Sequence, residues 1–219
     1  MGRSIKLKTK QRQRRLPGII NPVLLIHGID NSGRRMRAMQ LALLKHGFSP
    51  VVAMDIIPAD GSIPIEKMGE QVRVAACELI LATGADKIDV VAYSMGALAA
   101  RYFLQRLGGK EIIRRFISIS GPHHGTLTAW FRPQIACRQM RPGSDLLNDL
   151  NADPDPFHKV DVFSYYTPYD LMVFPSHSSI MEYAHNQAFH VLLHPLMITD
   201  KRVIEAVVQA LAASMDFLR

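Results

Sequence analysis

Apolar residues fall into two kinds of stretch along this chain, and the two kinds follow each other in turn. Short runs rich in Val and Ile predict buried β-strands at 22–28, 50–57, 87–93, 112–120, 161–168 and 188–193. Longer stretches with apolar residues at helical spacing predict helices at 34–46, 65–83, 95–107 and about 201–218. Strands without polar alternation, separated by helices, are typical of a parallel sheet with helices on both faces. We therefore expect an α/β fold with a mostly parallel central sheet.

One segment departs from this regular order. Residues 121–160 connect two expected strands, are rich in Pro and Gly, and are longer than an ordinary connection. A helix-like stretch lies within them at 143–150, and we expect the segment to form a loop or small cap. Folds of this class place their sites at the carboxyl ends of the strands, where this segment begins. No internal repeat or second domain is evident, so residues 19–219 are expected to form a single domain.

The excess of basic charge is concentrated at the N-terminus. Residues 1–15 contain seven of the 26 Lys and Arg residues and no acid, so the remaining 19 basic residues equal the 19 acidic ones. This stretch lacks an apolar core and is not typical of a secretory signal. We expect residues 1–18 to form a solvated, disordered tail, and the alternative is contact with anionic lipid headgroups. Nucleic acid is not an expected partner, because no nucleic-acid-binding module follows the tail.

Membrane-spanning and metal-binding classes are not favoured by the sequence. No apolar stretch reaches the roughly 18 residues that a membrane-spanning helix needs. Cys77 and Cys137 do not have the spacing of metal ligands, and free thiols are typical of a reducing compartment. His123 and His124 are adjacent, point in different directions and have no further ligand at a suitable spacing. We expect no metal or organic cofactor and a cytoplasmic location, with or without membrane contact through the tail.

The sequence VVAYSMGALAA, residues 90–100, places Ser94 between an expected strand and an expected helix. A serine at such a junction is either a helix N-cap or a nucleophile held on a sharp turn. The turn packs the positions two before and two after the serine against neighbouring elements, so both must be small. Here they are Ala92 and Gly96. The buried strand before Ser94 and the helix after it favour the nucleophile.

A serine hydroxyl is a poor nucleophile at neutral pH and needs a histidine base that a carboxylate orients. On a strand–turn–helix scaffold of this kind, the acid and then the base follow the serine along the chain. Asp170 comes after the strand at 161–168, at the end of the sheet where Ser94 lies. Asp161 begins that strand at its opposite end, and Glu182 lies farther along. Asp170 is therefore the expected acid, and its alternative role is to stabilise a turn.

Four histidines follow the acid, at positions 177, 185, 190 and 194. The base must lie on the loop between the last strand and the last helix. His190 lies within the apolar run at 188–193, whereas His194 ends that run and precedes the last helix. Position therefore favours His194 as the base, with His190 as the alternative. His177 and His185 are expected to face solvent.

Two backbone amides are candidates to bind the oxyanion that forms in acyl transfer. Met95 follows Ser94 at the start of a helix, and the helix dipole there favours negative charge. Ile29 lies in the loop after the first strand, within the sequence HGIDNSG. His27, at the start of that loop, is expected to brace it rather than to act as a second base.

Six stretches together resemble the α/β-hydrolase lipases and esterases, above all the small bacterial triacylglycerol lipases. They are PVLLIHGI (22–29), AYSMGALAARYFLQ (92–105), FISISGPHHGT (116–126), QMRPGSDLLNDLN (139–151), TPYDLMVFP (167–175) and HPLMITDKRVIEAV (194–207). The likeness extends over roughly residues 20–215. It implies the α/β-hydrolase fold, a triad of Ser94, His194 and Asp170, and oxyanion donors at Ile29 and Met95.

Hydrolysis of lipid-type carboxylic esters through an acyl-enzyme is the function that the residues and the resemblance favour. A thioesterase or an acyltransferase is the alternative, because the triad specifies an acyl carbonyl and not the group attached to it. A third class binds acyl ligands without turnover, and the complete set of three residues argues against it. Trp130 and Phe131 either line an acyl pocket or contribute ordinary packing. The expected partner is a lipid or a small acyl ester.

Overall fold

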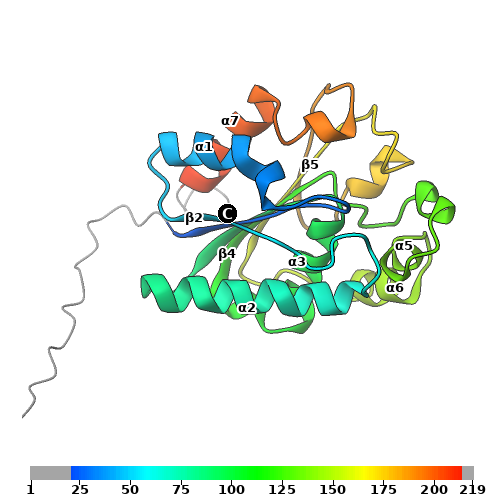
Figure 1. The fold of residues 1–219 in the computed structure, drawn as a ribbon, viewed down its shortest axis with the longest axis horizontal. Helices are drawn as coiled ribbons and strands as arrows, with labels where there is room; N and C mark the ends of the chain where they lie inside the picture. Colours follow the sequence, from blue (N-terminus) through cyan, green and yellow to red (C-terminus); the bar gives the residue numbers. More distant parts are fainter. Residues whose placement is uncertain (1–20, 214–219) are drawn as a thin grey trace, which may run out of the picture.

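A six-stranded sheet runs through the protein, and every neighbouring pair of its strands is parallel (Figure 1). The computed structural model describes residues 21–213. The strands lie in the order β2-β1-β3-β4-β5-β6. Their bounds are β1 (Val23–Ile26), β2 (Val51–Met54), β3 (Ile88–Tyr93), β4 (Ile113–Ile119), β5 (Asp161–Tyr166) and β6 (His185–Ala188). The expected α/β fold with a parallel central sheet is confirmed.

Helices occupy most of the connections between the strands. Their bounds, with η for a 3-10 helix, are η1 (Gly33–Met36), α1 (Arg37–Lys45), α2 (Ile65–Thr83), α3 (Met95–Arg106), α4 (Gly109–Ile112), η2 (Leu127–Phe131), α5 (Ile135–Gln139), α6 (Asp145–Asn151), η3 (Ser176–Ser179), η4 (His194–Leu196) and α7 (Lys201–Ala212). The sequence pattern predicts α2 and α3 to within one residue. The helix expected at about 201–218 is α7, which ends at Ala212 because Ala213 is not helical; residues 214–218 lie outside the described part of the chain.

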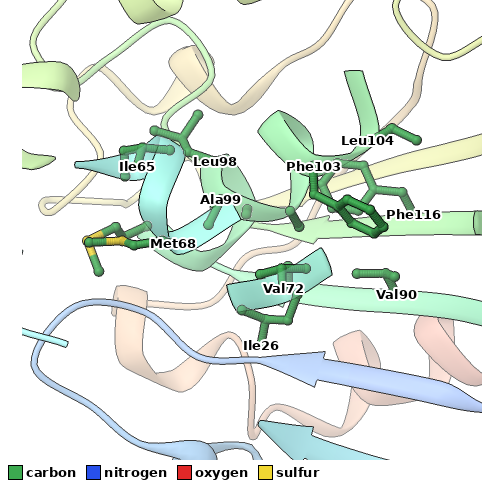
Figure 2. Close-up of a cluster of buried hydrophobic side chains, with 14 of the residues drawn as sticks. Ile26, Ile65, Met68, Val72, Val90, Leu98, Ala99, Phe103, Leu104 and Phe116 are labelled. Atoms are coloured by element: carbon green, nitrogen blue, oxygen red, sulfur yellow. The ribbon is translucent and has the colours of Figure 1, made fainter. Parts of the chain in front are cut away.

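The helices cover both faces of the sheet, with α2 and α3 on one face and α1 and α7 on the other (Figure 1). Successive strand residues point to opposite faces. In β1, Leu24 and Ile26 pack with α2 and α3, whereas Val23 and Leu25 pack with α1 and α7. Figure 2 shows the first of these two clusters, in which side chains of α2 and α3 meet those of the strands. Burial on both faces explains why these strands show no polar alternation.

The last strand lies earlier in the chain than the sequence pattern predicts. We expect residues 188–193, but β6 is formed by His185–Ala188 at the edge of the sheet, and all of its residues are exposed. An exposed edge strand needs no apolar residues, so the apolar run is a misleading signal there. The run instead leaves the sheet. Phe189 and Val191 pack into the cluster with α1 and α7, whereas Leu192 and Leu193 are exposed.

The long segment after β4 contains η2, α5 and α6. The helix expected within 143–150 is α6, one to two residues later than predicted at its start and end. Figure 1 shows α5 and α6 grouped at one end of the molecule. The buried guanidinium of Arg101 in α3 donates to the carbonyl oxygen of Leu150 in α6 at 2.9 Å. Burial lowers the pKa of Arg101 to about 10, so this group stays charged and ties the segment to the sheet-covering helix α3.

Asp89 on β3 is a carboxyl group that the fold buries without full pairing. It is 1% exposed, and its Oδ2 atom has no hydrogen-bond partner in the described part of the chain. Burial raises the pKa of Asp89 to about 6, although the positive charges of Arg115 and Arg114 oppose the shift. The native protein therefore binds a proton at Asp89 more tightly than the unfolded chain, in which the pKa of an Asp is about 3.9.

We predict that Asp89→Asn stabilises the protein at pH 7 but hardly at pH 4. At pH 4 the native carboxyl group is protonated and resembles the amide. As the pH rises from about 4 to above 6, the wild type should lose up to about 3 kcal/mol of unfolding free energy relative to the variant. Urea unfolding of both proteins at the two pH values measures this change. The same difference at both pH values would contradict a raised pKa at Asp89.

Candidate active site

Ser94 lies on the tight turn between β3 and α3. Its backbone has φ +55° and ψ −127°, a conformation that residues with a side chain rarely adopt and that surrounding packing must enforce. The residue stands at the N-cap position of α3, yet its side chain makes no capping hydrogen bond. Helix capping therefore does not account for this serine.

Close approaches explain the small residues around Ser94. A Cβ atom on Gly96 would lie 2.1 Å from the carbonyl oxygen of His27, which is shorter than any allowed contact. A Cβ atom on Gly28 would lie 2.9 Å from the Cβ of Ser94. Ala92 is fully buried in β3, between β1 and β4. The loop after β1 and the first turn of α3 can therefore meet at the serine only because these positions are small.

Asp170, His194 and Ser94 form a chain of hydrogen bonds. The Nδ1 atom of His194 lies 2.6 Å from Asp170 Oδ2, and its Nε2 atom lies 3.0 Å from Ser94 Oγ. A carboxylate only accepts, so Nδ1 carries the imidazole proton and Nε2 is free to accept the hydroxyl proton of Ser94. His194 and Asp170 are each 2% exposed. The three groups are thus placed to move a proton from the serine to the histidine.

Neighbouring groups fix the acid and the imidazole in place. Asp170 Oδ1 accepts hydrogen bonds from the amides of Met172 at 2.9 Å and Val173 at 2.8 Å. Such charge-assisted bonds set the rotation of the carboxylate. The ring of Tyr93 packs against the ring of His194 with centroids 4.9 Å apart, and its hydroxyl donates to the His194 carbonyl oxygen at 3.3 Å.

The other acids and histidines considered from the sequence lie elsewhere. His190, the alternative base, is exposed, and its Nδ1 atom lies 3.2 Å from the hydroxyl of Tyr169. Asp161 lies at the opposite end of β5, with Oδ2 3.7 Å from Nε of the buried Arg115. The remaining candidates are exposed side chains: His177, Glu182 and His185.

Met95 and Ile29, the two expected oxyanion donors, both lie near Ser94. Met95 is the first residue of α3, and amides in the first turn of a helix have no intrahelical partner. Ile29 lines the same cavity as Ser94. In the described part of the chain neither amide donates to a protein acceptor. Binding of an oxyanion by these two amides stays a prediction.

His27 fixes the direction of the Ile29 amide. Its Nε2 atom accepts a 2.9 Å hydrogen bond from the amide of Ile56, so its proton is on Nδ1, which donates to the carbonyl oxygen of Gly28 at 2.7 Å. Burial lowers the pKa of His27, which favours this neutral form. In a planar trans peptide the C=O of Gly28 and the N–H of Ile29 point in opposite directions. By holding the carbonyl on one side, His27 directs the amide to the other, so the expected bracing role is supported by its contacts.

A cavity of about 300 Å³ opens beside Ser94. Most of its wall is apolar, and it is lined by Ile29, Ser94, Pro122, Thr126, Thr128, Ala129, Phe131, Arg132, Cys137, Met140, Leu171, Met172 and Val173. The two residues of the aromatic pair, Trp130 and Phe131, are placed differently. Phe131 lines the cavity and is 88% exposed, whereas the ring of Trp130 packs under the guanidinium of Arg141, 4.3 Å from its centroid. Most of the cavity wall could not be anticipated, because its residues come from four segments that share no sequence period.

His123 and His124 do not lie together with other metal-type ligands. His123 is fully buried, its Nε2 atom lies 2.7 Å from Ser118 Oγ, and burial lowers its pKa. His124 is exposed. Within residues 21–213, no group of three or more His, Cys, Asp or Glu side chains is arranged to hold a metal ion. Cys77 and Cys137 are both free thiols.

No helix among the described residues is long and apolar enough to cross a membrane. The basic tail at 1–18 lies outside the described residues. Its expected disorder and its alternative contact with anionic lipids stay predictions.

Comparison with known sequences connects the chain to lipid-active enzymes. The model of the palmitoyl protein thioesterase family matches residues 22–151. A triacylglycerol lipase from Pseudomonas fragi is 31% identical over 110 residues, which cover 48% of this chain and 36% of that protein. The chain therefore matches only about a third of the length of this curated relative. The family match includes Ser94 and ends before Asp170 and His194.

Comparison with solved structures identifies the fold. Lipase B from Aspergillus fumigatus superposes with a TM-score of 0.76 at 17% identity, over 89% of this chain and 53% of that one. The mature form of a Bacillus licheniformis lipase gives a TM-score of 0.75 at 16% identity, over 92% of this chain and 95% of that one. These likenesses show the α/β-hydrolase fold that the sequence predicts. With residues 22–151 matched by the family model, the chain belongs to the palmitoyl protein thioesterase family.

Proposed function

We propose that this protein is a serine hydrolase that cleaves lipid-type carboxylic esters through an acyl-enzyme intermediate on Ser94. The observation that carries the proposal is the hydrogen-bonded chain Ser94–His194–Asp170, which opens on an apolar cavity. A nucleophile, a base and an orienting acid in this arrangement are what acyl transfer requires. The curated lipase relative and the lipase structures support the same chemistry.

The first step forms the acyl-enzyme. Ser94 Oγ bonds to the carbonyl carbon of the ester while its proton passes to His194 Nε2, 3.0 Å away. The carbonyl oxygen becomes an oxyanion, which the amides of Met95 and Ile29 bind. His194 then gives its proton to the alcohol oxygen, the ester C–O bond breaks, and the alcohol leaves.

The second step releases the acid. His194 takes a proton from water, and the resulting hydroxide oxygen bonds to the acyl carbon. The bond to Ser94 Oγ then breaks, and the serine recovers its proton from His194. Asp170 accepts the hydrogen bond from His194 Nδ1 and holds the imidazole in the tautomer that leaves Nε2 free. Every proton transfer in the cycle thus passes through His194 Nε2, and the two amides only bind the oxyanion.

The cavity beside Ser94 favours an apolar acyl group. Its lining is mainly aliphatic, aromatic and thioether side chains, with Arg132 as its one charged group. Each methylene buried there contributes about 0.8 kcal/mol, so binding should strengthen as the acyl chain lengthens. Phe131 and Leu171 line the cavity and are 88% and 73% exposed, as suits a substrate that lies in a lipid surface. A cytoplasmic location remains a prediction.

We predict that Ser94→Ala and His194→Ala each lower kcat for p-nitrophenyl esters by about 10⁴-fold or more. His190→Ala is the matched control, because His190 is the exposed alternative base, and it should keep activity within about twofold. Initial rates with acetate to palmitate esters, on variants with native circular dichroism, measure this. A large loss of kcat in His190→Ala with little loss in His194→Ala would identify His190 as the base and contradict the role proposed for His194. Full activity in a folded Ser94→Ala would remove the proposed nucleophile.

A thioesterase is the second candidate function, and the family match favours it. The same triad attacks a thioester carbonyl, and only the leaving atom differs. Comparing p-nitrophenyl palmitate and palmitoyl-coenzyme A at equal concentrations measures the preference directly. We predict a higher kcat/KM for the oxyester, because both the curated relative and the similar structures are lipases. A kcat/KM at least tenfold higher for the thioester, lost in Ser94→Ala, would replace the first candidate with the second.

A further inference from the structure

Two threonines of the segment after β4 contact the loop that carries Asp170. The Oγ1 atom of Thr126 accepts a hydrogen bond from the Phe174 amide at 2.9 Å and donates to the Met172 carbonyl oxygen at 2.9 Å. Thr128 Oγ1 donates to the same carbonyl oxygen at 2.6 Å. The Leu127 amide donates to the Phe174 carbonyl oxygen at 2.8 Å. The segment and the acid loop are thus joined by several bonds around the peptide that follows Met172.

That peptide links the threonines to the acid. Its C=O belongs to Met172, and its N–H belongs to Val173 and donates to Asp170 Oδ1 at 2.8 Å. The peptide is trans and planar, so its C=O and N–H point in opposite directions. Holding the carbonyl on one side therefore turns the amide toward Asp170 on the other. The opposite oxygen of Asp170 binds His194 Nδ1 at 2.6 Å.

Thr126 is the better placed of the two hydroxyls. It is 5% exposed, and it bonds both the Met172 carbonyl oxygen and the Phe174 amide. It therefore fixes the peptides on both sides of Val173. Without the Thr126 hydroxyl, the Met172 carbonyl would keep only Thr128 as a side-chain donor, and the Phe174 amide would lose its acceptor. The Val173 amide would then be held less firmly toward Asp170.

We propose that Thr126 is a positioning residue that holds Asp170 in the orientation in which it binds His194. The inference rests on the proposed function, because it assigns Thr126 a role in the reaction of Ser94. The relay runs from the Thr126 hydroxyl through the Met172–Val173 peptide to Asp170 and then to His194. Thr126 and Thr128 also line the cavity, so the same side chains form a wall of the substrate site.

The test compares Thr126→Val, which keeps the shape and removes the hydroxyl, with Thr126→Ser, which keeps the hydroxyl. Thr126→Val should lower kcat by about tenfold with KM within about twofold, as expected for the loss of one buried hydrogen-bonding group. Thr126→Ser should restore kcat to within about twofold of the wild type. A role only as cavity wall would instead change KM, and would not be rescued by serine.

Thr83→Val is the matched control for general destabilisation. Thr83 at the end of α2 also donates to a backbone carbonyl, that of Leu79 at 2.7 Å, and lies outside the site. The Thr83→Val variant should therefore keep kcat unchanged even if its melting temperature falls.

If Thr126→Val does not fold, a second variant tests the same peptide. Thr128→Val removes the other hydroxyl that donates to the Met172 carbonyl and should lower kcat by about threefold. An unchanged kcat in folded Thr126→Val, or in Thr128→Val if only that variant folds, would overturn the proposal.

A spectroscopic measurement separates this inference from the proposed function. The proton on His194 Nδ1 in its short bond to Asp170 should give a low-field proton resonance, identified by its loss in His194→Ala. The resonance should shift upfield or disappear in Thr126→Val and persist in Thr126→Ser and Thr83→Val. This result would support the positioning role even if no ester were cleaved. The wild-type resonance at an unchanged position in Thr126→Val would overturn it, whether or not the protein is a hydrolase.

Discussion

The close approach of α3 to the loop after β1 is the constraint on which the site depends. Only a glycine at position 96 lets the carbonyl oxygen of His27 come so near the first turn of α3. That contact brings Ser94, Met95 and Ile29 to one place at the end of the sheet. At the same turn Ser94 has a strained backbone conformation with φ +55°. The buried strand before the serine and the apolar helix after it, packed in the cluster of Figure 2, offset this strain.

The same arrangement of hydrogen bonds orients two backbone amides near Ser94. In each case a side chain hydrogen-bonds the carbonyl of a peptide whose N–H points toward the site. His27 holds the Gly28 carbonyl and directs the Ile29 amide, and Thr126 holds the Met172 carbonyl and directs the Val173 amide. Preorganised amides cost no rearrangement when charge develops, which is why a rigid second layer serves acyl transfer. The long segment after β4 thus both lines the cavity beside Ser94 and contacts the loop that carries Asp170.

Local chemistry explains what could be predicted from the sequence. The meeting of Ser94, Asp170 and His194 could be expected, because a steric pattern marks the turn at Ser94 and because the carboxyl ends of parallel strands lie at one edge of the sheet. Their catalytic roles stay a proposal. The exposed strand β6 was not predictable from apolar pattern, since an edge strand need not be apolar. The cavity and the role of Thr126 depend on contacts between segments about 45 residues apart, and no local period records such contacts.

The proposed mechanism requires that Ser94 becomes acylated during turnover. The most direct measurement is mass spectrometry of the intact protein, and then of its peptides, after rapid acid quench of a reaction with p-nitrophenyl butyrate. We expect one butyryl group per chain, located on Ser94 and absent in Ser94→Ala. In His194→Ala that has been acylated chemically on Ser94, the butyryl group should persist longer, because no base activates water. Acylation of another residue, or serine-independent release of p-nitrophenol with no adduct at Ser94, would contradict it.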